Sequence, residues 1–200
     1  MAPNRSLPPV VGERRPMLKN LTLALAFLGV ALAGKTASAA DTHLAVPGQA
    51  WEIRFDAPAY DKAEEQDHPG QYMLRGTGGR FNLSYYLETP SCAGGASNDA
   101  LYECYKDALR RNPMVIPSTV RANALAKGVA VMYMMQVESN GRKIALFNVN
   151  ILFAHAGKQG DLHVSYVAPQ SADIAALVKL ADSFDIVDSA AAAPAASAPK

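Results

Sequence analysis

The chain has 200 residues and nearly balanced charge, with 19 Lys and Arg against 18 Asp and Glu. Half of its residues are hydrophobic, which argues against a disordered chain and fits one globular domain of roughly 150 ordered residues. The basic residues form no cluster of the kind that nucleic acid requires, so nucleic acid is not an expected partner.

The first forty residues are expected to direct export. An apolar run of thirteen residues, 21–33, follows Arg14, Arg15 and Lys19, and a small-residue stretch, 36–40, comes next. This order is typical of a cleaved secretory signal, and the apolar run is shorter than the roughly 20 residues that span a bilayer.

Cleavage is predicted after Ala39, which ends an A-x-A site, or one residue later, after Ala40. The chain then divides into a signal peptide (1–39), a single domain (41–188) and an Ala/Pro-rich tail (189–200) that is expected to be disordered. Such a protein would be periplasmic or secreted, with no membrane span after cleavage.

Two export routes remain open. Arg14 and Arg15 begin a stretch that resembles the twin-arginine motif, with Met17 where that motif favours Phe. Alternatively, translation starts at Met17, which leaves an ordinary general-secretory signal. The second route is the simpler one, and both lead out of the cytoplasm.

The domain is expected to open with a polar lead-in at 41–50. Trp51, Ile53 and Phe55 then alternate with polar residues, which predicts a half-buried strand. The acidic run 60–70 has no apolar period and is expected to be a solvated loop or a frayed helical turn. A cation site among its residues 61–68 is the alternative, although the run lacks the ligand spacing and turn-forming Gly of a hard-metal loop.

A hairpin is predicted next, with strands at 71–75 and 80–88 around a Gly-rich turn. A helix over 98–111 follows, with Ser97 or Asn98 as its N-cap. Its apolar spacing places Cys104 on the buried face, beside Leu101, Tyr105 and Ala108.

Cys92 and Cys104 are the only cysteines of the chain. An even count in an oxidising compartment predicts a structural disulfide. A redox-active pair is the less favoured alternative, because no C-x-x-C spacing is present to lower a thiol pKa.

Three consecutive antiparallel strands are predicted over 129–168, after an extended segment at 119–126. Asn140-Gly141 is a strong signal for the first turn of this meander. The second turn is expected at 157–160.

A final helix is predicted over 172–184. The order of elements therefore predicts an α+β fold: an antiparallel sheet of about six to seven strands, with the meander 129–168 central and helices 98–111 and 172–184 packed on it. This order, together with the closing Leu180-Ala181-Asp182-Ser183-Phe184, resembles the PsbP/DcrB-like exported proteins over 51–186. The resemblance implies a non-catalytic accessory or binding role and assigns no functional residue.

His155 and His163 flank the second turn of the meander and are candidate metal ligands. A two-residue loop would separate them by placing His155 opposite Leu162, whereas a loop one residue longer would pair the two histidines. The apolar match across the strands favours the first register, and with it two ordinary sheet histidines.

Four methionines, Met114, Met132, Met134 and Met135, suggest a Cu(I) site because thioethers bind that ion. No His lies among them, so polarizable core packing is the preferred interpretation.

No nucleophile elbow or zinc-binding spacing is present, so catalysis is not expected. We expect an exported binding or accessory protein without a cofactor, whose partner is an unidentified protein or small molecule. Its surface could use Tyr85, Tyr86, Tyr133, Asn148 and Asn150, although the two Asn residues also fit plain solvent-facing sheet positions. The alternative is an exported enzyme or metal-binding protein that uses His155, His163 or the acidic run.

Overall fold

The computed structural model describes residues 40–92 and 96–188. Their strands form two antiparallel sheets, one of three strands in the order β1-β2-β10 and one of seven in the order β3-β4-β5-β9-β8-β7-β6. Two α-helices and a short 3-10 helix complete the α+β fold that the sequence predicts. In chain order the elements are β1 (Ala40–Ala45), β2 (Trp51–Ala57), β3 (Asp61–His68), β4 (Gln71–Gly78), β5 (Phe81–Glu88), α1 (Asn98–Arg111), η1 (Pro117–Thr119), β6 (Arg121–Leu125), β7 (Gly128–Ser139), β8 (Arg142–His155), β9 (Lys158–Val167), α2 (Ser171–Asp182) and β10 (Asp185–Asp188).

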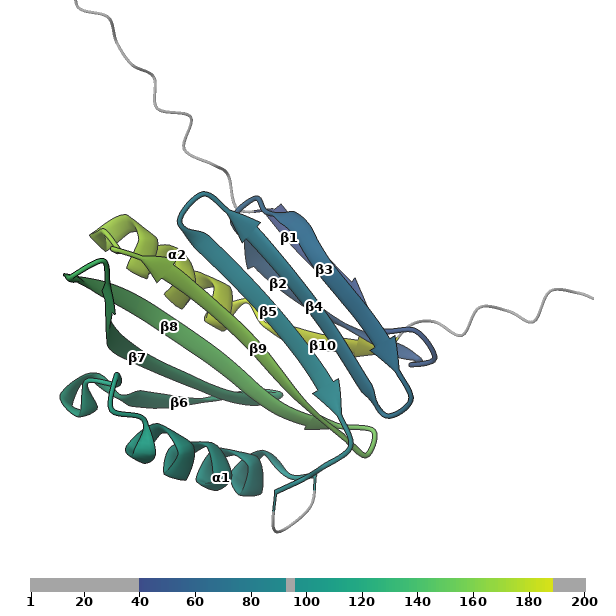
Figure 1. Cartoon of the computed structure of the whole chain (residues 1–200). Helices are drawn as coiled ribbons and strands as arrows, with labels where there is room; N and C mark the ends of the chain where they lie inside the picture. Colours follow the sequence, from purple (N-terminus) through teal and green to yellow (C-terminus); the bar gives the residue numbers. More distant parts are fainter. Residues whose placement is uncertain (1–39, 93–95, 189–200) are drawn as a thin grey trace, which may run out of the picture. The chain divides into compact units, whose positions relative to one another are not determined.

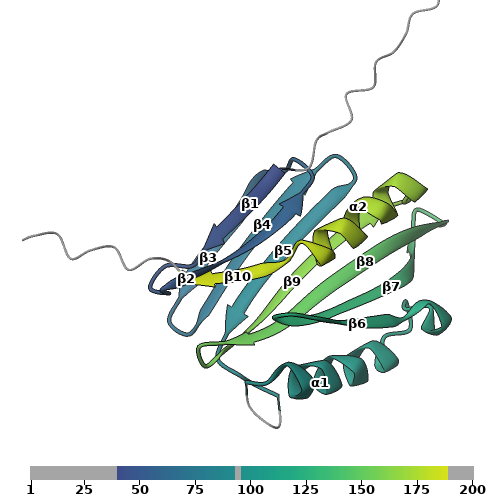
Figure 2. The same ribbon diagram turned by 180° about the vertical axis from the view of Figure 1, so that it is seen from behind.

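The main core lies between the seven-stranded sheet and a layer made of α2 and the small sheet. Figure 2 shows α2, β10, β2 and β1 together in front of the large sheet. Apolar side chains from alternate positions of β5, β8 and β9 meet those of α2 and β2 there. The largest fully buried side chains of this core include Tyr85, Phe55, Phe81, Phe153 and Ile53.

The opposite face of the seven-stranded sheet is only partly covered. Helix α1 packs against β8 and β7 and closes a second, smaller apolar cluster that contains Leu101, Leu109, Val131 and Leu152. In Figure 1 no described helix lies in front of β9, β5 or β4. Arg75 of β4 and Asn82 of β5 are exposed, whereas Gln159 and Ser165 of β9 are buried.

Two predictions about individual segments are wrong, and one strand was not predicted. The expected polar lead-in contains strand β1, which pairs with β2. The acidic run is β3, an exposed edge strand paired with β4, because main-chain hydrogen bonds form regardless of side-chain polarity. Strand β10, which follows α2 and pairs with β2, was not predicted.

The second turn of the meander also differs from both expected registers. Ala156 and Gly157 form it, with φ of 48° and 74°, so that His155 faces Lys158 and Phe153 faces Gly160. Gly157 belongs to the predicted turn, but Ala156 gives no turn signal, because positive φ is sterically unfavourable for alanine. The two histidines are nevertheless separated, as the favoured register required, because Asn150 is the residue opposite His163. The Asn140-Gly141 turn forms where it was predicted.

Candidate binding site beside helix α1

Helix α1 is fixed against the sheet at its two ends. Ser97 Oγ accepts a hydrogen bond from the backbone of Ala100 at the N-terminus, as a helix cap should. Asn98 Oδ1 accepts from the backbone N–H of Ala154 in β8 at 2.8 Å. Beyond the C-terminus, the backbone of Ile116 donates to Met134 of β7 at 2.9 Å. One side of the helix is therefore held directly above β7 and β8.

The disulfide adds a third attachment. Cys92 and Cys104 are bonded, with a Cα–Cα distance of 6.0 Å, which confirms the predicted pairing. The predicted burial of Cys104 is wrong, because Cys104 and Ala108 lie on the exposed side of α1, whereas Leu101 and Leu109 are buried. The bridge thus ties the loop after β5 to the outer side of the helix.

Beneath α1 a chain of hydrogen bonds crosses from the helix to β9. The hydroxyl oxygens of Tyr105 and Tyr133 are 3.0 Å apart, and the Tyr133 hydroxyl donates to Asn150 Oδ1 at 3.1 Å. Asn150 Nδ2 donates to both carboxyl oxygens of Asp161, at 2.8 and 3.0 Å. Since Tyr133 has one proton and gives it to Asn150, Tyr105 must donate to Tyr133. All donors therefore point in one direction, toward Asp161.

Asp161 is the acceptor at the end of this chain. Burial raises the pKa of its carboxyl from an ordinary value of 3.8 to about 7, the hydrogen bond from Asn150 opposes the rise, and the negative charge of Glu88 adds to it. Burial also raises the pKa of both Tyr105 and Tyr133, so their hydroxyls stay protonated. Near neutral pH the carboxyl of Asp161 is therefore poised between its charged and neutral forms.

A pocket of about 210 Å³ opens beside Asp161. The C-terminal half of β5, the start of β9 and one side of α1 surround it, and the disulfide forms part of its wall. Its lining residues are Tyr86, Glu88, Ser91, Cys92, Leu101, Cys104, Tyr105, Ala108, Leu152, Gln159, Gly160 and Asp161. Gln159 steadies one side by donating to Glu88 Oε1 at 2.7 Å and to Ser91 Oγ at 3.1 Å.

The predicted surface residues divide between this site and the cores. Tyr86 lines the pocket, and Tyr133 and Asn150 belong to the hydrogen-bond chain below it. Asn148 and Asn150 are only 2% and 3% exposed, so the solvent-facing interpretation is wrong for both. Tyr85 lies in the main core, fully buried, and cannot contact a ligand.

The candidate histidine ligands do not converge. His163 Nε2 lies 3.0 Å from Asn148 Oδ1, and burial lowers its pKa to about 4, so the ring is neutral and donates to the amide oxygen. His155 packs edge-on against Trp51 with ring centroids 5.0 Å apart and lies 3.6 Å from Asp188. Within residues 40–92 and 96–188, no three His, Cys, Asp or Glu side chains gather as a metal site would require.

The acidic run belongs to the edge strand β3, and the candidate methionines lie in different surroundings. Glu65 of β3 pairs with Lys62 and accepts a hydrogen bond from Tyr72 at 2.8 Å. Met132 packs against the main core and Met135 against the smaller one, whereas Met114 is 43% exposed.

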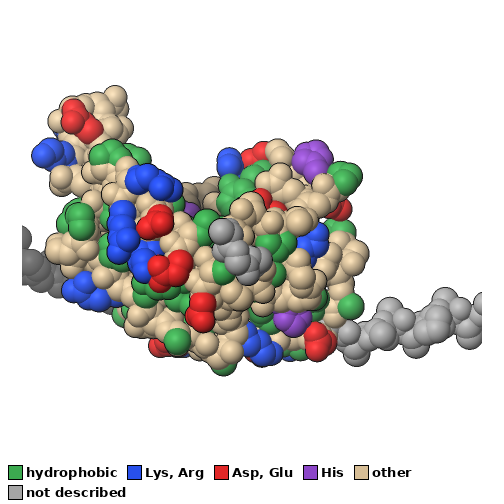
Figure 3. Space-filling model, turned by 90° about the horizontal axis from the view of Figure 1, so that it is seen from below, with side chains coloured by type: hydrophobic (Ala, Val, Ile, Leu, Met, Phe, Trp, Pro, Cys, Tyr) green, Lys and Arg blue, Asp and Glu red, His purple; other side chains and the backbone are tan. Residues whose placement is uncertain are grey.

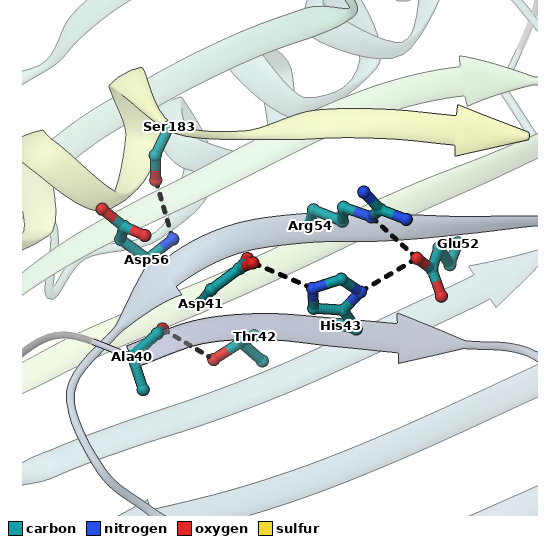
Figure 4. A network of polar contacts seen from close by, with 8 residues as sticks. All are labelled: Ala40, Asp41, Thr42, His43, Glu52, Arg54, Asp56 and Ser183. Atoms are coloured by element: carbon teal, nitrogen blue, oxygen red, sulfur yellow. Dashed lines mark hydrogen bonds and ion pairs between the residues drawn. The ribbon is translucent and has the colours of Figure 1, made fainter.

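A second polar network lies on the small sheet (Figure 4). His43 of β1 lies 3.0 Å from Asp41 and 3.0 Å from Glu52 of β2, and Arg54 donates to the same Glu52 oxygen at 2.7 Å. Both carboxylates raise the pKa of His43 by hydrogen bonding. The network joins β1 to β2 on the surface.

Sequence reasoning missed Asp161, Glu88 and Tyr105 as site residues. In the sequence, polar Asp161 stands next to apolar Leu162, and such an alternation is common in strands with one buried face. Its distinctive feature is its position beside Asn150 and beneath α1, and that position depends on the register of β8 and β9 and on helix packing.

No family model matches the chain, and no curated protein matches it. The expected resemblance to PsbP/DcrB-like proteins is therefore unsupported. Among solved structures the chain is similar to LpqN of Mycobacterium tuberculosis, described as involved in cell envelope biogenesis, with a TM-score of 0.43 and 12% identity over 74% of this chain and 91% of that one. At this level the likeness carries no conclusion about function, which has to come from the residues themselves.

Proposed function

We propose that this chain is an exported, non-catalytic binding protein that takes a small ligand in the pocket beside α1. The proposal rests on the surroundings of Asp161. Its carboxyl lies at the wall of the pocket, and among the described residues only Asn150 donates a hydrogen bond to it. A buried carboxyl held by one neutral donor retains acceptor capacity that a ligand can use.

Two features support export. The leader pattern of residues 1–39 is typical of a secretory signal, and these residues lie outside the described part of the chain. The alternative cleavage position, after Ala40, falls at the first residue of β1. The Cys92–Cys104 bridge fits an oxidising compartment. Among the described residues no helix is long and apolar enough to cross a membrane.

Binding is favoured over catalysis by the arrangement inside the pocket. A hydrolase needs a nucleophile beside a base that can take its proton. The hydroxyl of Ser91, which lines the pocket, accepts a hydrogen bond from Gln159, and His163 is engaged with Asn148 rather than with a hydroxyl. Ser91 and His163 therefore do not form the hydrogen-bonded pair of nucleophile and base that a hydrolase uses.

The test is native mass spectrometry of the protein recovered from its exporting host without reductant. We expect a mass two hydrogens below that of the chain that begins at Ala40 or Asp41, with a fraction carrying an additional small molecule. The variant Ala108→Trp, which fills the pocket from α1, should lose the additional mass. Ala175→Trp, on the exposed side of α2, is the matched control and should retain it. If both variants carry the additional mass equally, the ligand lies elsewhere and the proposal is wrong.

A further inference from the structure

The pocket beside α1 is lined by acidic side chains and by no basic one among the described residues. Two of its lining side chains, Asp161 and Glu88, are acidic, and none of the described lining residues is Lys, Arg or His. Glu88 Oε1 accepts from the neutral amide of Gln159, and Asp161 accepts from the neutral amide of Asn150. Both acids therefore have hydrogen-bond partners but no counter-charge among the described lining residues.

Elsewhere, acidic side chains of the described residues are commonly matched by bases. Figure 3 shows Lys and Arg side chains intermixed with Asp and Glu in the view from below. On α1 itself, Lys106 pairs with Glu103, and Arg110 pairs with Asp107 at 3.3 Å. Further pairs join Glu52 to Arg54, Asp56 to Lys179, Glu64 to Arg75, Asp173 to Arg80 and Asp185 to Lys127. Asp161 and Glu88 of the pocket have no such basic partner among the described residues, and unlike the other acids without one they share a pocket.

Arg75, a basic residue of β4 on the same sheet face, is committed to other partners. Its Nη2 donates to the hydroxyl of Tyr86 at 3.0 Å, and its Nη1 lies 3.5 Å from Glu64. It does not line the pocket. The acids at the pocket therefore lack a basic partner from the described part of the chain.

The remaining walls suit the apolar and aromatic contacts of an organic cation. Tyr86 and Tyr105 line the pocket, and aromatic rings attract cations through their faces. Leu101, Leu152 and Ala108 supply an apolar surface. The volume of about 210 Å³ is below the roughly 300–1,000 Å³ typical of sites for drug-sized ligands, so the ligand is small.

We infer that the ligand of this pocket is a small organic cation, an ammonium group carrying a short apolar chain, with Asp161 and Glu88 as its anionic contacts. The ammonium would donate to the carboxyl oxygens, which Asn150 and Gln159 already orient, and the chain would lie against Leu101 and Leu152. This inference rests on the proposed binding function and specifies its ligand class.

Three probes with one carbon skeleton test the charge requirement. n-Butylammonium, n-butanol and butyrate would each be titrated at pH 8 into the full domain with its disulfide intact, with backbone amide NMR shifts as the readout. We expect n-butylammonium to shift the amides of Gly160, Leu101 and Tyr105 in a saturable manner. The affinity for n-butanol and for butyrate should be at least tenfold weaker.

Variants then assign the charge to its residues. Asp161→Asn and Glu88→Gln should each weaken n-butylammonium binding at least fivefold, whereas Asp107→Asn, on the exposed side of α1, should leave it unchanged. An unfolding curve for each variant shows that the fold is retained. Because the carboxamide oxygen introduced by Asp161→Asn can still accept from Asn150, that substitution removes the charge while it keeps the shape.

The outcomes separate this inference from the proposed function. Equal or tighter binding of n-butanol or butyrate in the pocket would overturn the cation inference while supporting a binding pocket. Unchanged binding of n-butylammonium in both acidic variants would overturn it as well. Amide shifts confined to residues remote from the pocket with all three probes, together with no retained mass from the exporting host, would overturn both proposals.

Discussion

The ring of Phe153 in β8 lies directly over Gly160, its cross-strand partner in β9. A Cβ atom built at Gly160 would fall 2.6 Å from Cε2 of the ring and closer still to Cζ and Cε1. Real Cβ atoms do not approach that closely, so the absence of a side chain at 160 makes room for the aromatic ring. Phe153 in turn stacks on Tyr85 and contacts Phe184, just beyond α2, which links this glycine to the main core.

Gly160→Ala should therefore destabilise the fold by about 1–3 kcal/mol, the usual cost of overpacking a filled core. Chemical denaturation measures the change. As a control, Gly160→Ala is also made in the Phe153→Leu variant, in which the smaller side chain leaves space at position 160. There the penalty of Gly160→Ala should be clearly smaller, and an equal penalty in both backgrounds would show that the ring is not the obstacle.

Removing the disulfide should lower the free energy of unfolding by about 3 kcal/mol, the value that chain entropy gives for a loop of this size. The bridge spans twelve positions, from Cys92 to Cys104. The measurement compares urea denaturation of the wild type with that of the Cys92→Ser/Cys104→Ser double variant. Reductant should destabilise the wild type and leave the double variant unchanged; a response of the double variant would show that the reductant acts elsewhere.

Tyr85→Phe should be neutral or stabilise the protein, by up to about 1–2 kcal/mol, because an unsatisfied buried hydroxyl costs free energy that the phenyl side chain avoids. The hydroxyl of Tyr85 is buried and has no hydrogen-bond partner among the described residues. Thermal unfolding measures the difference.

The control is Tyr72→Phe. Tyr72 packs edge-on against Tyr85, and its hydroxyl donates to Glu65 at 2.8 Å. Tyr72→Phe removes this existing hydrogen bond and should lower the free energy of unfolding by about 0.5–1.5 kcal/mol. Equal losses in the two variants would contradict the assignment.

The stability of the protein should depend on pH through Asp161. Its pKa is about 7 in the folded protein against an ordinary 3.8, so the folded state holds a proton that the unfolded state loses between those values. Its favourable contribution is complete below pH 3.8 and is lost as the pH rises through 7, by roughly 2–4 kcal/mol. Asp161→Asn should thus match the wild type at pH 4 and exceed it in stability at pH 8.

His163 makes stability fall with decreasing pH, the opposite of the effect of Asp161, but it does not disturb this comparison. Its pKa is about 4 in the fold against an ordinary 6.5, so its contribution is lost as the pH falls from 6.5 through 4. Both proteins contain His163, and the difference between their urea denaturation curves isolates Asp161. A stability difference that stays constant from pH 4 to pH 8 would exclude a raised pKa at Asp161.

Local patterns in the sequence determined the α+β class, helix α1, the main hairpins and the cysteine pair. Helix α1 begins at Asn98 and ends at Arg111, as predicted, because its N-cap and the following Pro113 are both signals from residues at its own ends. The Asn140-Gly141 turn was equally legible, since both residues tolerate positive φ.

Tertiary structure alone decided the candidate site. Strand β3 forms through backbone hydrogen bonds to β4, although the side chains of β3 are almost all exposed. The turn at Ala156-Gly157 set the register that places Asp161 beside Asn150, and it did so through a positive φ that alanine disfavours. Packing of α1 on that register then brought Tyr105 onto the hydrogen-bond chain and the disulfide onto the pocket wall. Sequence patterns report how a residue suits its immediate neighbours, whereas a pocket depends on which strands and helices meet, and those contacts join residues far apart in the chain.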